Sequence, residues 1–417
     1  MKLRTTLALI GFAAPLGAQT VQAPRFEVDM LWPKPLPTHW LLGSATGVAV
    51  DSRDHVWVLN LPNSFTGRTE TGAEATPPIG ECCFPSPNVL EFDAGGTLVG
   101  HWGGPGPGYT WPSSNAGIAI APSGNIWIGG AGPRDTQILE FTRDGKFVRA
   151  IGKEGPPVSA GPAAASDTAY AGVSRGGGGA GGRGGGGGGR GRGRGVVIPP
   201  LPANSAAADA FGGPTRVSFD AKTNEAYVAD GSRNHRVAVV DVASGTIKRA
   251  WGANGKAPTD VSGADASAQF GNPVACAALS NDGMVYVCDR ANDRIQVFDK
   301  SGTFVTERAV APSTKGAGSV WDASFSRDRQ QKYLYVADGQ NMKVWILDRQ
   351  TLEPLSSFGD GGRQPGEFFA LHSIATDSKG NVYTVETLEG KRLQKFVFKG
   401  VTAVPKNQGV TWPKGGK

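Results

Sequence analysis

The chain has 417 residues, of which 62 are glycine and 29 are proline, and its formal net charge is +6. This composition indicates many tight turns, and few segments show the 3.6-residue apolar period of a helix, so a helical class is excluded. Five arginines between Arg175 and Gly195, together with Lys2 and Arg4, leave the rest of the chain at a formal charge of −1. A body so close to neutral excludes a broad nucleic-acid-binding surface.

Residues 1–18 have the three parts of a secretory signal peptide: a basic start, an apolar middle and a small-residue end. Cleavage after Ala18 is favoured over cleavage after Ala23, which would leave Pro24 immediately downstream. The alternative is a membrane anchor, but the apolar stretch is too short to cross roughly 30 Å of hydrocarbon. The sequence therefore predicts a secreted or periplasmic protein with no membrane span.

One structural unit recurs along residues 19–417. Its clearest copies lie at 226–241, 285–299 and 334–348, and each contains an aromatic residue between apolar neighbours. The aromatic residues of the six copies are Trp57, Trp127, Tyr227, Tyr286, Tyr335 and Tyr383, at successive intervals of 70, 100, 59, 49 and 48 residues. A base period just under fifty residues, with insertions in the first three intervals, is typical of β-propeller blades.

Each copy predicts four strands: a small-residue strand, an aromatic strand, an alternating strand and a strand that ends at glycine. We therefore expect an all-β protein, a single six-bladed β-propeller over residues 19–417 with four-stranded blades. Residues 25–31 alternate like a strand but precede the first copy, and the last copy lacks an obvious fourth strand. We expect residues 25–31 to complete blade six and close the ring; residues 401–404 are the competing candidate.

The insertions are predicted to share one face of the propeller. Connections between second and third strands, and between blades, lie on one face, and insertions at 61–87, 153–213 and 253–271 all fall in such connections. Function usually resides on elaborated loops, so we expect any site on this loop-rich face. Within the second insertion, the Gly/Arg-rich segment at about 156–202 is predicted to be disordered. RNA binding is the alternative, disfavoured because exported proteins rarely meet RNA.

The four cysteines suggest disulfides in an exported chain. Cys276 and Cys288 flank the turn 281–283, and a three-residue turn places them directly opposite each other at a bridgeable separation. A cross-strand disulfide is therefore predicted, with two buried free thiols as the alternative. For the adjacent Cys82 and Cys83, a vicinal disulfide is favoured over free thiols. A zinc site made of cysteines is disfavoured, because no second Cys-x-x-Cys pair is present.

The repeats at 285–299 and 334–348 resemble NHL repeats. The run from residue 211 to residue 400 resembles the propeller of bacterial peptidyl-α-hydroxyglycine α-amidating lyases, which cleave a carbinolamide to an amidated peptide and glyoxylate. This resemblance implies zinc bound by histidines at the starts of inner strands, and a catalytic tyrosine in a blade loop. His372 matches one zinc position, and Ser232 stands where the family has its tyrosine.

Two further zinc positions of that family lack histidine here. Blade four has Val274 or Ala275 at the corresponding place, and blade two has Ala116 within residues 115–118. The resemblance therefore transfers the fold, whereas the lyase activity is not expected. Of the other histidines, His55 and His101 are expected to be structural or solvated.

Two functions remain open. The first is a secreted binding or scaffold propeller that uses its loop-rich face, with His372, Asp322, Arg216 and Trp321 as binding residues, for a peptide, protein or small-molecule ligand. The second is a divergent metal-dependent lyase built around His372. With one imidazole, a metal would need water or carboxylates such as Asp322, so zinc or calcium would be held weakly.

Overall fold

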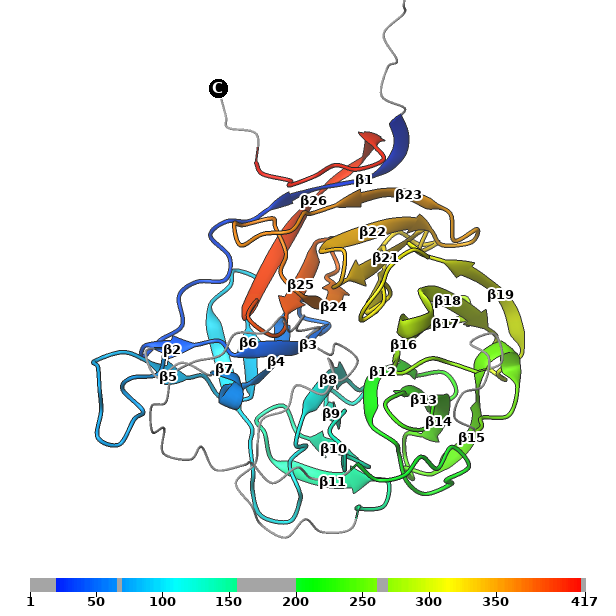
Figure 1. Ribbon diagram of the computed structural model, residues 1–417, viewed down its shortest axis with the longest axis horizontal. Helices are drawn as coiled ribbons and strands as arrows, with labels where there is room; N and C mark the ends of the chain where they lie inside the picture. Colours follow the sequence, from blue (N-terminus) through cyan, green and yellow to red (C-terminus); the bar gives the residue numbers. More distant parts are fainter. Residues whose placement is uncertain (1–19, 66–69, 156–199, 261–268, 414–417) are drawn as a thin grey trace, which may run out of the picture.

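The computed structural model describes residues 20–65, 70–155, 200–260 and 269–413. Six four-stranded antiparallel sheets form a ring around a central channel (Figure 1), and the described residues contain no α-helix. The predicted six-bladed, all-β propeller is thus confirmed. The predicted signal peptide at 1–18 and most of the predicted disordered segment at 156–202 lie outside the described residues. No helix in the described part of the chain is long and apolar enough to cross a membrane.

Each blade runs from an innermost strand at the channel to an outermost strand. Blades one to three are β3 (Ser44–Val50), β4 (Val56–Leu61), β6 (Val89–Phe92), β7 (Leu98–Trp102); β8 (Asn115–Ile120), β9 (Ile126–Gly130), β10 (Ile138–Phe141), β11 (Phe147–Ile151); and β12 (Pro214–Asp220), β13 (Glu225–Asp230), β14 (Arg236–Asp241), β15 (Ile247–Trp251). Blades four to six are β16 (Val274–Leu279), β17 (Val285–Asp289), β18 (Arg294–Phe298), β19 (Phe304–Ala309); β20 (Asp322–Phe325), β21 (Tyr333–Asp338), β22 (Lys343–Asp348), β23 (Pro354–Phe358); and β24 (Leu371–Thr376), β25 (Val382–Glu386), β26 (Arg392–Pro405), β1 (Thr20–Val28).

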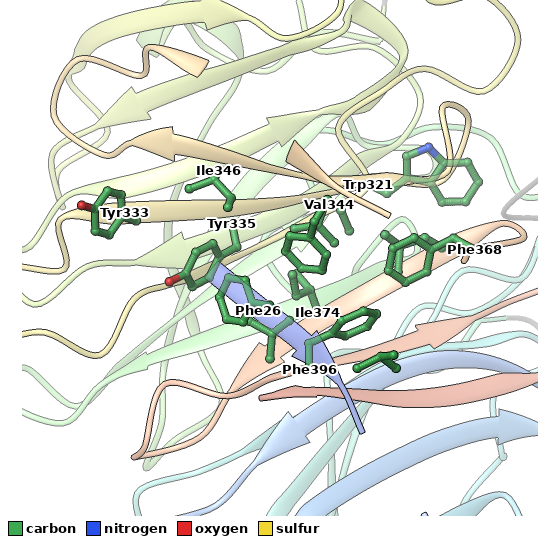
Figure 2. Close-up of a cluster of buried hydrophobic side chains, with 14 of the residues drawn as sticks. Phe26, Trp321, Tyr333, Tyr335, Val344, Ile346, Phe368, Ile374 and Phe396 are labelled. Atoms are coloured by element: carbon green, nitrogen blue, oxygen red, sulfur yellow. The ribbon is translucent and has the colours of Figure 1, made fainter. Parts of the chain in front are cut away.

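The six repeated aromatic residues all lie on second strands and are buried, as predicted. Each belongs to a hydrophobic cluster shared by its own blade and the next one around the ring. Tyr335 of blade five, for example, packs with Phe26, Ile374 and Phe396 of blade six (Figure 2). The core is therefore six inter-blade layers, which explains why the repeat carries one large ring per blade.

Polar contacts at the ends of the second strands account for other positions of the repeat. The Asp230 carboxylate accepts hydrogen bonds from the Gly212 backbone N–H at 2.5 Å and from Arg236 Nε at 2.8 Å. Asp289 and Glu386 make the equivalent pairs of contacts in blades four and six. Because each carboxylate ties the third strand to the connection that enters its blade, these residues serve blade packing rather than ligand binding.

The N-terminal strand closes the ring. β1 pairs with β26 from Thr20 opposite Pro405 to Val28 opposite Phe396, so the predicted closing strand is confirmed and begins five residues earlier than 25. The competing residues 401–404 are part of β26 itself. Figure 1 shows the blue first strand beside the red last one.

Residues 406–411 add a second fastening, between blades five and six. The Ser357 N–H of β23 donates to the Lys406 carbonyl at 3.0 Å, and the Val28 N–H of β1 donates to the Thr411 carbonyl at 2.8 Å.

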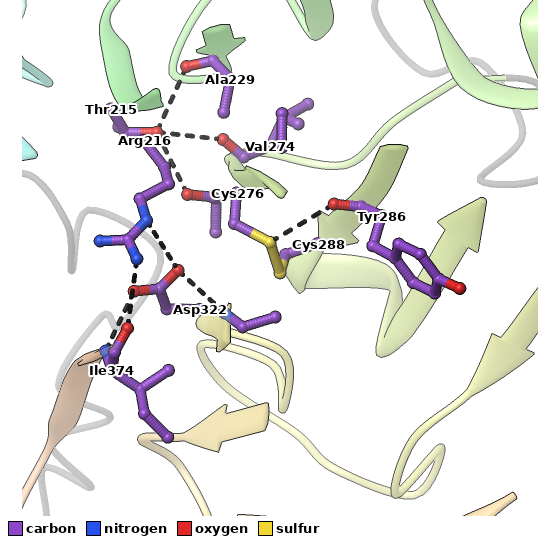
Figure 3. The surroundings of a disulfide bond; sticks show 12 residues. Thr215, Arg216, Ala229, Val274, Cys276, Tyr286, Cys288, Asp322 and Ile374 are labelled. Atoms are coloured by element: carbon purple, nitrogen blue, oxygen red, sulfur yellow. Dashed lines mark hydrogen bonds and ion pairs between the residues drawn. A yellow bond between two sulfur atoms is a disulfide. The ribbon is translucent and has the colours of Figure 1, made fainter. Parts of the chain in front are cut away.

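Both predicted disulfides are present. Cys276 and Cys288 are directly opposed, with Cα atoms 4.8 Å apart (Figure 3). The register argument holds because the turn has three residues: the Ser280 N–H donates to the Met284 carbonyl at 2.8 Å. Cys82 and Cys83 form the vicinal bridge, in the loop between the second and third strands of blade one.

Candidate functional site at the channel mouth

The channel opens on the loop-rich face at the starts of the innermost strands. In blades one, two, three, four and six, a β-bulge interrupts the pairing of the first two strands at the same level. The extra residues are Thr46, Ala116, Ala275 and His372 in blades one, two, four and six, and in blade three the shift lies between Pro214 and Val217. Bulges re-aim side chains and often occur beside functional sites. His372 therefore occupies a position that three other blades fill with small side chains, and the equivalence of His372, Ala275 and Ala116 within the ring agrees with their places in the sequence repeat.

His372 lies against a stack of two other side chains. Its ring meets the Trp321 ring edge-on, with centroids 5.7 Å apart, and the Arg290 guanidinium lies 4.3 Å from the Trp321 ring centroid on the adjoining blade. Arg290 and Trp321 are buried and His372 is half-buried. His372 Nδ1 is buried and has no hydrogen-bond partner among the described residues.

The imidazole is neutral at ordinary pH. Burial, and then the positive charge of Arg290, lower the pKa of His372 to about 3, while a hydrogen bond with the Thr46 backbone opposes the shift. A neutral imidazole presents one nitrogen lone pair as a hydrogen-bond acceptor. The stack thus offers an acceptor, an aromatic edge and a fixed positive charge within one small region of the mouth.

Arg216 and Asp322 form a second group, one residue further along the innermost strands. Arg216 donates to the Val48 carbonyl of blade one at 2.9 Å and to the Ile374 carbonyl of blade six at 3.2 Å. Its Nε lies 3.5 Å from Asp322 Oδ1 (Figure 3). Asp322 Oδ2 also accepts from Ser373 Oγ at 2.6 Å and from the Ile374 N–H at 3.0 Å. These two side chains are therefore committed to bracing the channel wall.

The predicted binding residues thus fall into two sets. The structure brings His372 and Trp321 together at the mouth, and Arg216 with Asp322 below them. Sequence reasoning missed Arg290. A signal was available, because glycine follows the strand-end aspartate in blades three and five (Gly231 and Gly339), whereas blade four has Arg290 after Asp289. An added Cβ at Gly339 would lie 2.8 Å from the Trp321 ring, so glycine is needed there by close packing.

The donors around His372 do not fit a zinc ion. Ala116 and Ala275 stand at the equivalent bulges, the Asp322 oxygens are hydrogen-bonded, and the charge of Arg290 opposes a cation. The metal role of His372 stays a prediction.

Three potential metal ligands do gather elsewhere in the described chain, on the opposite face. Donor atoms of Asp51, His55 and Glu91 lie within 4.8 Å of one another. Arg143 already occupies this cluster: its Nη1 is 2.5 Å from Asp51 Oδ2, and its Nη2 contacts Glu91. His55 Nδ1 is 2.6 Å from Glu91 Oε1. The group is a charge network at the junction of blades one and two, in agreement with a structural His55.

The blade-one insertion is fastened next to the mouth. Its β5 (Phe84–Pro85) pairs in parallel with β2 (Trp40–Leu41), in the connection that enters blade one. Glu70 accepts from Lys391 Nζ of blade six at 3.1 Å, and the same ammonium lies 4.6 Å from the Phe65 ring centroid. The insertion therefore spans from blade one to blade six, the blade that carries His372.

No family model and no curated protein matches the chain. Among solved structures, a streptogramin B lyase is similar, with TM-score 0.46, 11% identity, and coverage of 90% of this chain and 98% of that chain. A catalytically inactive virginiamycin B lyase from Staphylococcus aureus with quinupristin has TM-score 0.44 and 11% identity, covering 92% and 89% of the two chains. A protein of unknown function from Bacteroides thetaiotaomicron has TM-score 0.46 and 13% identity, covering 86% and 70%. At such identities the likeness is one of fold alone, and membership of the amidating lyase family is not confirmed.

Proposed function

We propose that the chain is a ligand-binding propeller that receives its ligand at the channel mouth of the loop-rich face. The observation that carries this proposal is the buried, unpartnered Nδ1 of His372 beside the Arg290–Trp321 pair. Leaving a buried acceptor unsatisfied costs about 1–3 kcal/mol, which a donor on a ligand would recover. A ligand is thus a physical explanation for an arrangement that the fold alone does not need.

The stack defines the chemistry of the ligand. An N–H or O–H group of the ligand can donate to His372, the positive charge of Arg290 favours a negative group, and the Trp321 ring favours a flat or apolar part. A small molecule or peptide end with an amide N–H beside a carboxylate meets all three requirements. The Arg216–Asp322 pair, which already contacts the channel wall, would form the floor below this ligand.

A secreted or periplasmic location is part of this proposal. The signal-peptide pattern at 1–18 supports it, and so do two disulfide bonds, since disulfides persist in oxidising compartments. A divergent metal-dependent lyase is the second candidate, favoured by one observation: a neutral imidazole with a free nitrogen is the form that binds metals. The surrounding donor set favours the binding role.

Calorimetric titration with N-benzoylglycine tests the proposal. This molecule combines an amide N–H, a carboxylate and an aromatic ring. We expect the wild type to bind, His372→Ala to bind about two- to tenfold more weakly, and Arg290→Gln to bind about tenfold or more weakly, since a hydrogen bond between neutral groups is worth about 0.5–1.5 kcal/mol and one to a charged group about 1.5–3 kcal/mol. His101→Ala, on the outer strand of blade one, is the matched control and should bind like the wild type.

Elemental analysis after dialysis and a glyoxylate-release assay on an α-hydroxyglycine peptide distinguish the two candidates. The binding role predicts little retained metal and no turnover. Stoichiometric zinc, with turnover abolished in His372→Ala, would establish the lyase instead.

A further inference from the structure

A cavity of about 500 Å³ opens on the face opposite the channel-mouth site, between blades five and six. It lies beside the first turns of these blades, 326–332 and 378–380. Tyr335 of β21 lines it, together with Phe398 and Val401 of β26. This plain-face pocket shares no residue with the site of the proposed function, so the two can be tested separately.

Comparison with the other blades shows what is unusual about Tyr335. Four of the five equivalent aromatic residues donate a hydrogen bond to a protein group. Tyr383, for example, donates to Asp377 Oδ2 at 3.0 Å. Tyr335 makes no hydrogen bond to a described residue, although only 1% of it is exposed. Figure 2 shows the hydroxyls of Tyr335 and Tyr333 extending to the same end of the hydrophobic cluster.

The hydroxyl of Tyr335 remains a donor at any ordinary pH. Burial, followed by the charge of Asp328, raises the pKa of this phenol. Tyr335 lines the pocket and otherwise belongs to a cluster of apolar side chains, so a ligand in the pocket can supply a partner for the hydroxyl.

The rim of the plain-face pocket is cationic. Arg327, Lys332 and Lys379 line it, against one carboxylate, Asp328. That carboxylate is already engaged, because it accepts from the Lys332 backbone N–H at 3.0 Å and from the Ser326 hydroxyl. Asp54 lies near Lys379 and Arg327, and it accepts from the Ser378 hydroxyl at 2.6 Å. Three cations thus face two engaged carboxylates, which favours a negative ligand above a floor that is aromatic and apolar.

We propose that the plain-face pocket binds a small organic anion with an apolar body. The acidic group would lie at the cationic rim, the hydrocarbon or aromatic part would pack on Phe398 and Val401, and an oxygen of the ligand would accept the Tyr335 hydroxyl. The volume lies within the roughly 300–1,000 Å³ range of small-molecule sites.

Fluorescence titration with 8-anilinonaphthalene-1-sulfonate, an aromatic sulfonate, tests this pocket in the folded protein. We expect one site, with binding of the uncharged N-phenyl-1-naphthylamine about three- to tenfold weaker because exposed cations contribute modestly. Val401→Trp should fill the pocket and abolish this site. Val305→Trp places the same bulk on an equally exposed position of β19, outside the pocket, and should leave binding unchanged.

The hydroxyl is tested by Tyr335→Phe, which keeps the ring. We expect affinity for the sulfonate to fall about threefold or more, as for loss of one hydrogen bond, while the melting temperature stays unchanged because the hydroxyl has no protein partner. Tyr383→Phe is the matched variant and should do the reverse: lower the melting temperature and leave affinity unchanged. Unaltered binding in Val401→Trp, equal loss in Val305→Trp, or no wild-type binding below millimolar concentration would each overturn the proposal.

Discussion

Arg216 of blade three and Asp322 of blade five meet across the central channel, with Nε of the arginine 3.5 Å from Oδ1 of the aspartate. The two blades are not neighbours, and the same guanidinium donates to carbonyls of blades one and six. One side chain therefore links four of the six blades at the channel, where small inner-strand residues leave room for it.

Replacing Arg216 with methionine should destabilise the fold. The variant loses two charge-assisted hydrogen bonds and leaves Asp322 without its cation, so we expect the free energy of unfolding to fall by about 2–3 kcal/mol. Denaturant unfolding measures this. Arg308→Met is the control, because Arg308 and Glu353 form an exposed pair worth less than about 1 kcal/mol. Equal effects in the two variants would show that Arg216 does not brace the channel.

Loss of the Cys276–Cys288 bridge should cost more stability than loss of the vicinal bridge. The double variant Cys276→Ala, Cys288→Ala should lose about 2–4 kcal/mol, because its bridge closes a 12-residue separation in the unfolded chain. Replacing Cys82 and Cys83 by serine removes a bridge between adjacent residues, which restrains the unfolded chain little. Non-reducing peptide mapping checks the pairing first; a link from Cys276 to Cys82 or Cys83 would contradict it.

His372 should give the protein an acid-sensitive stability between pH 6.5 and about 3. The folded-state pKa is about 3 against an ordinary 6.5, so in this window the unfolded chain takes up a proton that the folded chain does not. The free energy of unfolding therefore falls as pH falls, by up to about 1.4 kcal/mol per pH unit. Melting temperatures of wild type and His372→Gln, compared from pH 7 to pH 4, should converge as the pH drops; parallel curves would refute this.

Replacing residues 156–199 with a short Gly-Ser linker should leave the melting temperature within about 2 °C of wild type. The segment is too biased in composition to bury much apolar surface, and its two described ends lie close together: a Cβ on Gly155 would be 3.3 Å from Leu201 Cδ1. Leu201 must be kept, because its N–H donates to the Pro133 carbonyl at 2.9 Å. A clear loss of stability would mean that the segment packs on the propeller.

Features that depend on counting along strands could be predicted from the sequence. The aromatic residue of each blade, the closing strand and the Cys276–Cys288 pairing follow from period-two alternation and turn length, which fix which residues face each other. His372 was placed correctly for the same reason, since the bulge that carries it recurs at one level in the ring.

Features that depend on where a long side chain reaches could not be predicted. Arg216 was expected to face a ligand, yet it spans the channel to carbonyls on the far wall. Arg290 stacks on a tryptophan of the next blade, a contact between residues about thirty positions apart in the sequence. Rotamers of arginine and the radius of the channel decide both outcomes, and neither is encoded in strand periodicity.

The pairing of β1 with β26 sets an order of events for a newly made chain. β1 is made before the other strands of the ring but belongs to the last blade, so it has no sheet to join until β26 has been made. Until then blade six is incomplete, and β1 has no strand with which to pair. At high concentration β1 of one copy can pair with β26 of another, so we expect strand-swapped dimers among the misfolded products.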